Sequence, residues 1–236
     1  MSRLFFYLAI LSLFLSIRHV RSAHINPTTT IIACDLDEVV ISGREASYMH
    51  WLMAPSRLSF AMTVKKVRKR YKLYDPLLII EKIKQLYPKL SKKAEEFKKI
   101  IGLAPLKKKT VALLGLVAQQ GYTFVAASNM AKGTYGTLVQ NQVLPEIFSP
   151  EIYFVKTKKS NKKADGSYYE KPDLEYFINL KKYIQKKYPD KRFEHIVFID
   201  DKEKNVKVAR EAGLIAIHYK NSQQLRESLV QIGIIV

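Results

Sequence analysis

The sequence predicts an α/β fold in which helices cover both faces of a parallel β-sheet. After residue 106, segments with apolar residues at helical spacing alternate with short apolar runs rich in β-branched residues. Because helix and strand alternate in this way, right-handed crossovers and a three-layered core with a parallel sheet are expected. The expected helices are 106–120, 131–141, 172–188 and 202–212; the expected strands are a first one starting near Thr30, then 123–127, 151–155, 196–199 and 214–218.

The segment 42–105 interrupts this alternation. It contains no obvious strand, whereas 74–87 and 91–101 carry apolar residues at helical spacing with lysines between them. We therefore expect an α-helical insertion at 42–105, placed after the first strand, and a core domain made of 30–41 and 106–236.

Asp35 and Asp37 stand one residue apart at the end of the first apolar run, Ile31 to Cys34. Such a strand end delivers charge to the edge where open α/β sheets bind their ligands. Two like charges this close repel each other, so one should keep its proton or both should face a cation. A proton donor beside a nucleophile and an oxygen site for Mg²⁺ both satisfy that condition. The metal site of a nucleotide-sugar transferase and a pair of solvated loop carboxylates also remain open at this point.

Polar side chains also follow two later strands, and a lysine precedes one helix. They are Ser128 and Asn129, then Lys171, then Asp200 and Asp201. Parallel strands bring their carboxyl ends to one edge of a sheet, so these side chains are expected near Asp35 and Asp37. A structural explanation is open for each, because serine and aspartate commonly cap helices and Lys-Pro commonly precedes one.

Taken in chain order, these residues resemble the four motifs of the haloacid dehalogenase-like (HAD) superfamily of phosphohydrolases. The matching motifs are Asp35-x-Asp37-x-Val39, Ser128, Lys171 and Asp200-Asp201-x-x-x-Asn205. Any one of them is weak evidence, but four in order on a compatible strand pattern are specific. The resemblance covers roughly residues 31–219. It implies a Rossmann-like core and indicates that 42–105 is a helical cap that closes over the site.

The resemblance implies a Mg²⁺-dependent phosphatase that hydrolyses phosphate monoesters through an aspartyl-phosphate intermediate. Asp35 would be the nucleophile, which divides one difficult displacement into two easier ones. Asp37 would protonate the leaving alcohol and then deprotonate the attacking water. A dehalogenase needs no such acid, because a halide leaves without a proton, so Asp37 argues against dehalogenation.

The same resemblance gives the remaining motif residues binding roles. The catalytic set is Asp35, Asp37, Ser128 and Lys171; the substrate-binding set is Ser128, Asn129 and Lys171; the metal set is Asp35, the backbone carbonyl of Asp37, Asp200 and Asp201. Ser128 would donate a hydrogen bond to the transferred phosphoryl group, and Lys171 would offset its charge. Asp201 aligns best with the family's metal-binding carboxylate, and the resemblance leaves open whether Asp200 and Asn205 would bind the metal directly or through water.

Two alternatives share the fold. One is a non-catalytic or membrane-surface binding protein, against which the presence of all four motifs argues. The other is a HAD phosphotransferase, which Asp37 favours as much as a phosphatase. The aromatic group from Tyr48 to Trp51 is a candidate specificity surface, although packing between cap and core is an ordinary role for such residues.

The N-terminal segment is distinct from the core. Residues 4–17 form a continuous apolar run of 14 residues, which as a helix span about 21 Å, short of a hydrocarbon core of about 30 Å. That length is typical of a secretory signal peptide, here 1–22, and predicts a secreted or periplasmic protein starting near Ala23. Arg18 and Arg21 are atypical of a signal, so an uncleaved membrane anchor is the alternative.

The chain of 236 residues has 40 Lys and Arg against 21 Asp and Glu, a formal net charge of +19. The lysines are scattered and no recognised nucleic-acid-binding motif accompanies them, so a nucleic-acid partner is not expected. Positive charge of this size should instead steer a small phosphorylated substrate towards the site. Cys34 is the single cysteine, which excludes an intramolecular disulfide and fits a small buried strand residue.

Overall fold

The computed structural model describes residues 25–42, 50–102, 104–156 and 159–234. The predicted signal peptide, 1–22, lies outside these residues, and so do Tyr48 and Met49 of the aromatic group. Within those ranges, none of the helices combines the length and the apolar character that a membrane span requires.

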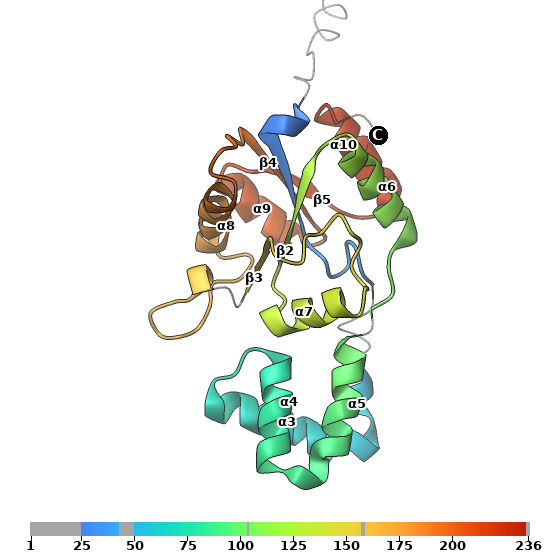
Figure 1. Ribbon diagram of the computed structural model, residues 1–236, viewed down its shortest axis with the longest axis vertical. Coiled ribbons are helices and arrows are strands. Elements are labelled where there is room, and N and C mark those ends of the chain that lie inside the picture. The colour runs from blue at the N-terminus through green and yellow to red at the C-terminus, as the bar shows by residue number, and fades with distance from the viewer. Residues whose placement is uncertain (1–24, 43–49, 103, 157–158, 235–236) are drawn as a thin grey trace, which may run out of the picture.

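Five parallel strands form the central sheet, in the order β3-β2-β1-β4-β5 (Figure 1). They are β1 Thr30–Cys34, β2 Thr123–Ser128, β3 Tyr153–Val155, β4 His195–Asp200 and β5 Ile215–His218. Both faces of β1 are covered: Ile32 and Cys34 belong to one hydrophobic cluster, and Ile31 and Ala33 belong to the other. Burial on both faces explains why this strand is uniformly apolar. The prediction of an α/β core with a parallel sheet is confirmed.

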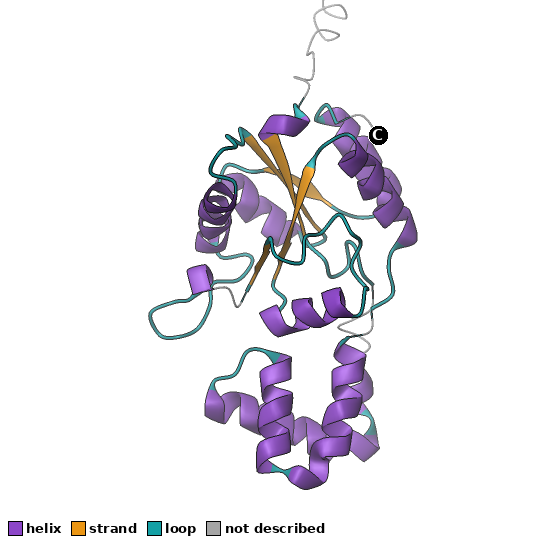
Figure 2. Ribbon diagram, in the orientation of Figure 1, coloured by secondary structure: helices purple, strands orange, loops and turns teal. Residues whose placement is uncertain are grey.

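Helices cover both faces of the sheet, as Figure 2 shows. Helices α6 Lys108–Gln119 and α10 Ser222–Gln231 cover one face, and α8 Leu174–Lys187 and α9 Glu203–Glu211 cover the other. Helix α7 Lys132–Gln140 lies near the edge where the strands end. The four helices predicted after residue 106 are present, with ends shifted by no more than two residues, and α10 lies beyond the span of the family resemblance.

Between β1 and α6 the chain forms a helical unit, residues 50–102, called the helical insertion below. Its main helices are α3 Leu58–Tyr71, α4 Pro76–Leu86 and α5 Ser91–Ile101. The insertion has its own hydrophobic cluster, in which the Trp51 ring stacks on Phe97 at 5.4 Å and meets Phe60 edge-on at 5.7 Å. Helices α4 and α5 coincide with the helical segments expected at 74–87 and 91–101.

Helix α3 is not apparent in the sequence. Its N-cap residue, Arg57, supplies no side-chain hydrogen bond, and only Phe60 and Val67 of its 14 residues are buried. Because its apolar stripe is narrow and its surface is rich in lysine and arginine, the helix depends on packing against α4 rather than on its own pattern.

One buried carboxylate, that of Asp75, joins the insertion to the core. Its Oδ1 accepts a hydrogen bond from Leu77 N at 3.0 Å at the start of α4, and its Oδ2 accepts one from Gly133 N at 2.7 Å in the first turn of α7. The N-cap residue of α7, Ala131, offers no side-chain acceptor of its own. Asp75 therefore satisfies free backbone donors at two helix N-termini, where the helix dipoles also favour a negative charge.

Gly133 is required for this contact, and a pair of alanine substitutions tests it. A Cβ on Gly133 would lie 2.6 Å from Asp75 Oδ2, whereas a Cβ on Gly136, also in α7, would meet nothing within 4 Å. We expect Gly136→Ala to raise the free energy of unfolding by about 0.5–1 kcal/mol, because alanine suits a helix interior better than glycine. Gly133→Ala should instead lower it by roughly 1–3 kcal/mol, because a hydrogen bond to a charged group is lost.

Urea unfolding of both variants measures the difference. An Asp75→Ala background supplies the control, since without the carboxylate the two alanines should have nearly equal effects. Equal stabilisation by both alanines in the wild-type background would show that Asp75 and α7 are not in contact in solution.

Candidate active site

The centre of the candidate site is the buried ammonium group of Lys171. Its Nζ lies 2.9 Å from Asp35 Oδ2 and 2.6 Å from Asp200 Oδ2, and it donates to the backbone oxygen of Ala127 at 3.0 Å. These partners come from the carboxyl ends of β1, β4 and β2, which are neighbours in the sheet. An ammonium has three protons to donate, so these contacts use all of them.

Burial governs the ionisation of these groups. It raises the pKa of Asp35 to about 7, and the nearby ammonium of Lys171 opposes that rise only in part. Burial alone would lower the pKa of Lys171, but the carboxylates of Asp35 and Asp200 raise it well above its ordinary value. Lys171 is therefore charged at neutral pH, whereas Asp35 titrates near neutrality.

Asp201 adds a third carboxylate beside Asp35 and Asp200. One ligand oxygen from each residue lies within 4.8 Å of the others, a grouping that can hold a metal ion. Burial, and then the neighbouring Asp200, raises the pKa of Asp201. Among the described residues, Asp201 Oδ1 and Asn205 Oδ1 are buried without a hydrogen-bond donor. Oxygens of this kind, next to carboxylates that outnumber the single ammonium, fit a hard divalent cation such as Mg²⁺.

Asp200 differs from Asp201 because both of its oxygens already have donors. Oδ2 contacts the Lys171 ammonium, and Oδ1 accepts from the backbone N of Lys202 and from Asn205 Nδ2, each at 2.8 Å. Asp200 thus holds Lys171 and orients Asn205. Asp201 Oδ1 has no such donor, whereas Asp200 would have to contact a metal in addition to its present donors.

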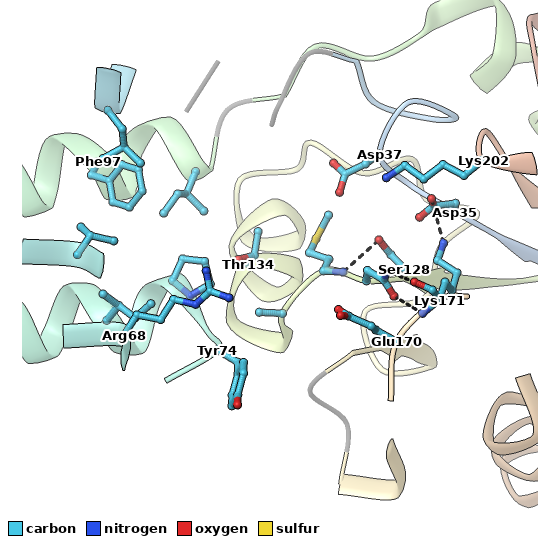
Figure 3. Close-up of a pocket in the computed structure, with 18 of the residues that line it drawn as sticks. Asp35, Asp37, Arg68, Tyr74, Phe97, Ser128, Thr134, Glu170, Lys171 and Lys202 are labelled. Atoms are coloured by element: carbon cyan, nitrogen blue, oxygen red, sulfur yellow. Dashed lines mark hydrogen bonds and ion pairs between the residues drawn. The ribbon is translucent and has the colours of Figure 1, made fainter. Parts of the chain in front are cut away.

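Asp37 lies on the pocket wall, but its side chain is not one of the three clustered carboxylates. The chain turns tightly after Asp35: the backbone N of Ile41 donates to Leu36 O at 2.9 Å, and Glu38 adopts a φ of 61°. The turn leaves Asp37 half-buried, and Figure 3 shows it on the same side of the pocket as Asp35. One strand end therefore presents a buried and a more accessible carboxylate to the same cavity.

Ser128 and Asn129 lie at the end of β2. Ser128 Oγ accepts a hydrogen bond from Met130 N at 3.3 Å, a contact that leaves the hydroxyl proton for donation to a ligand. Asn129 lines the pocket, but its Nδ2 donates to Lys171 O at 3.0 Å and its Oδ1 accepts from Lys171 N at 2.8 Å. In this structure Asn129 therefore positions Lys171, and the substrate-binding role expected from the sequence stays a prediction.

A pocket of about 470 Å³ lies between these residues and the helical insertion. The predicted residues on its wall are Asp35, Asp37, Ser128, Asn129, Lys171 and Asn205, while Asp200 and Asp201 are not part of the wall. Residues not predicted also line it: Arg68, Tyr74, Thr134, Glu170 and Lys202 (Figure 3). Glu170 and Lys202 are next to the motif residues Lys171 and Asp201 in the chain, so the sequence could have indicated that they lie near the site. Arg68 and Tyr74 reach the pocket through packing of the insertion, which no local pattern reveals.

Of the aromatic group, the structure describes His50 and Trp51. Trp51 is buried, but it does not line this pocket. It packs inside the hydrophobic cluster of the insertion, and the Arg57 guanidinium lies 4.4 Å from the centre of its ring. Its neighbour Leu52 lines the pocket instead.

Solved structures share this architecture. The HAD-hydrolase YfnB from Bacillus subtilis, solved bound to magnesium, matches over 85% of this chain and 97% of that one, with a TM-score of 0.51 and 14% identity. An L-2-haloacid dehalogenase from Xanthobacter autotrophicus matches over 86% of this chain and 82% of that one, with a TM-score of 0.50 and 13% identity. The chain has the HAD fold. A dehalogenase solved as an intermediate complex matches over 82% and 85% of the two chains, with a TM-score of 0.51 and 10% identity.

No protein-family model matches the sequence, and no curated protein matches it. The comparisons thus establish the HAD fold, and they do not establish which reaction the site performs. Within the HAD fold of this chain, the ends of β1, β2 and β4 carry Asp35, Ser128 and Asp200, with Lys171 between them.

Bound metal should stabilise this site in a pH-dependent way. The folded protein without metal holds a proton on Asp35 up to about pH 7, whereas the ordinary carboxyl pKa is 3.8. The Asp35 contribution to stability therefore falls as pH rises through that window, and Mg²⁺ must displace this proton at lower pH. We expect Mg²⁺ to raise Tm clearly at about pH 8 and much less at about pH 5.5.

Thermal melts with Mg²⁺ or with a chelator check this at both pH values. Asp35→Asn is the control, because its amide does not titrate and the pH dependence of the Mg²⁺ effect should shrink. An equal rise in Tm at both pH values would show that Mg²⁺ displaces no proton from Asp35 between them, which contradicts the raised pKa of this group.

Proposed function

We propose that this chain is a Mg²⁺-dependent phosphatase that hydrolyses phosphate monoesters through an aspartyl-phosphate intermediate. The observation that carries the proposal is the pair of unlike carboxylates on one pocket. Asp35 is buried against the Lys171 ammonium, and Asp37, two residues on, is half-buried on the wall of the same pocket. Carboxylates in different environments are suited to different roles, one as a nucleophile and the other as an acid and base.

In the first step, an oxygen of Asp35 attacks phosphorus and the bond from phosphorus to the ester oxygen breaks. Asp37 donates its proton to the departing alkoxide, so the alcohol leaves neutral. Lys171 offsets the negative charge of Asp35 and of the phosphoryl oxygens, and the Ser128 hydroxyl donates a hydrogen bond to one of them. In the second step, Asp37 takes a proton from water as the water attacks the aspartyl-phosphate, which releases inorganic phosphate and restores Asp35.

When bound, Mg²⁺ supplies positive charge that neutralises the phosphoryl oxygens and keeps Asp35 ionised. The residues that would hold it are Asp35, Asp200 and Asp201, with Asn205 beside them. Asp35 would need this nearby positive charge because burial raises its pKa to about 7 and a protonated carboxyl is a poor nucleophile.

Asp37 also favours a phosphatase over a dehalogenase. An alcohol leaving group requires a proton and a halide does not. An acid on the pocket wall would therefore assist hydrolysis of a phosphate ester but not dehalogenation. A phosphotransferase would use the same first step and then pass the phosphoryl group to an alcohol instead of water. The products therefore separate these activities.

A direct assay tests the proposal. We expect p-nitrophenyl phosphate to be hydrolysed with Mg²⁺, and hydrolysis to stop with a chelator and resume when Mg²⁺ is restored. Asp35→Asn should reduce kcat by roughly 10⁴-fold or more, the usual cost of losing a nucleophile, with an unchanged circular dichroism spectrum. Chloride release from 2-chloropropionate serves as the control reaction and should be absent. Full activity of Asp35→Asn, or release of chloride, would overturn the mechanism.

The acid role of Asp37 has its own signature in the first step. Pre-steady-state release of the alcohol reports this step alone. In Asp37→Asn, alcohol release from alkyl phosphates should slow by about 10²–10⁴-fold, whereas release of p-nitrophenol, a good leaving group that needs little protonation, should slow far less. Equal slowing for both classes of ester would show that Asp37 does not protonate the leaving group.

A further inference from the structure

The helical insertion lines its part of the pocket with a mainly apolar wall. Apart from Arg68 and Tyr74, the described residues that it contributes are apolar: Leu52, Val64, Pro76, Ile79, Phe97 and Ile101. Four of these, Leu52, Ile79, Phe97 and Ile101, also belong to the buried hydrophobic cluster of the insertion, so the pocket reaches into that cluster. The hydroxyl groups of a sugar would find few partners on such a wall, and leaving them unpaired is costly.

Arg68 is the single cationic side chain among the insertion residues described on this wall. It lies on α3, one turn after Val64, and is exposed. Figure 3 shows its guanidinium group directed from the insertion towards the core side of the pocket. No carboxylate in the described ranges of the chain forms an ion pair with it within 4.0 Å. Its donors are therefore available to a ligand.

Lys171, the cation at the core side of the pocket, differs from Arg68 because it is buried and its donors already have partners. The three donors of Lys171 are taken by Asp35, Asp200 and Ala127, so this ammonium has no donor left for a second anionic group. A second anionic group on the same molecule would have to find its partner elsewhere on the wall. Arg68, with a planar fork of donors that matches carboxylate and phosphate oxygens, is suited to that role.

We propose that the pocket selects phosphate monoesters whose leaving group has an apolar body and carries a second anionic group, which Arg68 binds. This inference rests on the proposed function, since it assumes that the ester phosphate sits at Asp35. The apolar body would lie against Val64, Ile79 and Phe97 and be stabilised by removal of its surface from water. The second anion is a carboxylate or another phosphate, because both present paired oxygens to a guanidinium.

The test uses phosphate esters of ω-hydroxy carboxylic acids of increasing chain length, with their neutral amides and the matching diol bisphosphates. In Arg68→Gln, the ratio of kcat/KM for the acid to kcat/KM for its amide should fall about tenfold, the effect of one exposed charge-assisted contact. The loss should appear in KM, and Arg68→Lys should recover part of it. The bisphosphate arm shows whether a second phosphate is preferred to a carboxylate.

Arg70→Gln is the matched control, because it removes the same charge from α3 at a residue outside the pocket wall. In this variant the ratio of acid to amide should stay at the wild-type value. An equal fall in both variants would mean general attraction of anions by the basic helix, which overturns the assignment of Arg68. Faster turnover of sugar phosphates than of the alkyl esters would overturn the apolar selection.

Calorimetric titration with non-hydrolysable phosphonate analogues of the same acids and amides separates the two proposals. Binding that depends on Arg68, without turnover of any ester, would contradict the phosphatase and leave only the anion-binding role of Arg68 standing. Turnover of the esters without any dependence of binding on Arg68 would contradict the selectivity alone.

Discussion

The candidate site depends on one buried charge, the ammonium of Lys171, placed where three neighbouring strands end. It holds the carboxylates of Asp35 and Asp200 together, and it contacts the backbone of Ala127 on a third strand. Removing one partner of a buried ion pair typically costs about 3–5 kcal/mol, because the remaining charge is stranded away from water. Asn129 fixes the backbone of Lys171 through two hydrogen bonds, so the position of this charge is set from the end of β2 as well.

The three carboxylates exceed the charge that Lys171 provides, and this excess has a physical consequence. Burial raises the pKa of Asp35 to about 7 and also raises the pKa of Asp201, so without a metal both carboxyls keep their protons to a higher pH than an ordinary carboxyl does. A divalent cation relieves the repulsion between the carboxylates while leaving them ionised. Under the proposed function, a bound metal would therefore have two effects together: it would stabilise the folded state, and it would prepare Asp35 for attack.

The core and its polar edge were predictable from sequence because each depends on a local pattern. Strand β1 is buried on both faces, and its sequence is therefore a continuous apolar run. Parallel strands bring Asp35, Ser128 and Asp200 to one edge of the sheet. Helix α3 and the pocket residue Arg68 were not predictable in this way. Their positions depend on how the insertion packs on itself and on the core, and that information is spread over contacts distant in sequence.

Asn129 illustrates a subtler limit of the sequence. Its place after a strand predicted a polar residue at the site, and it does line the pocket. The amide also makes two hydrogen bonds to the backbone of Lys171, 42 residues further along the chain, which the sequence did not predict. A motif position indicates where a side chain lies, but its hydrogen-bond partners decide whether it contacts a substrate or holds another residue.

The contact between insertion and core is part of the pocket rather than a remote attachment. Tyr74 and Pro76, which line the pocket, flank Asp75, whose carboxylate binds the first turn of α7 through Gly133. Ala131 and Thr134, on either side of Gly133, line the same pocket. Any movement of the insertion away from the core must therefore break the contact of Asp75 and separate the apolar wall from Asp35 and Asp37. The hydrogen bond from Gly133 N to Asp75 thus helps to hold the wall that would receive a leaving group against the carboxylates that would release it.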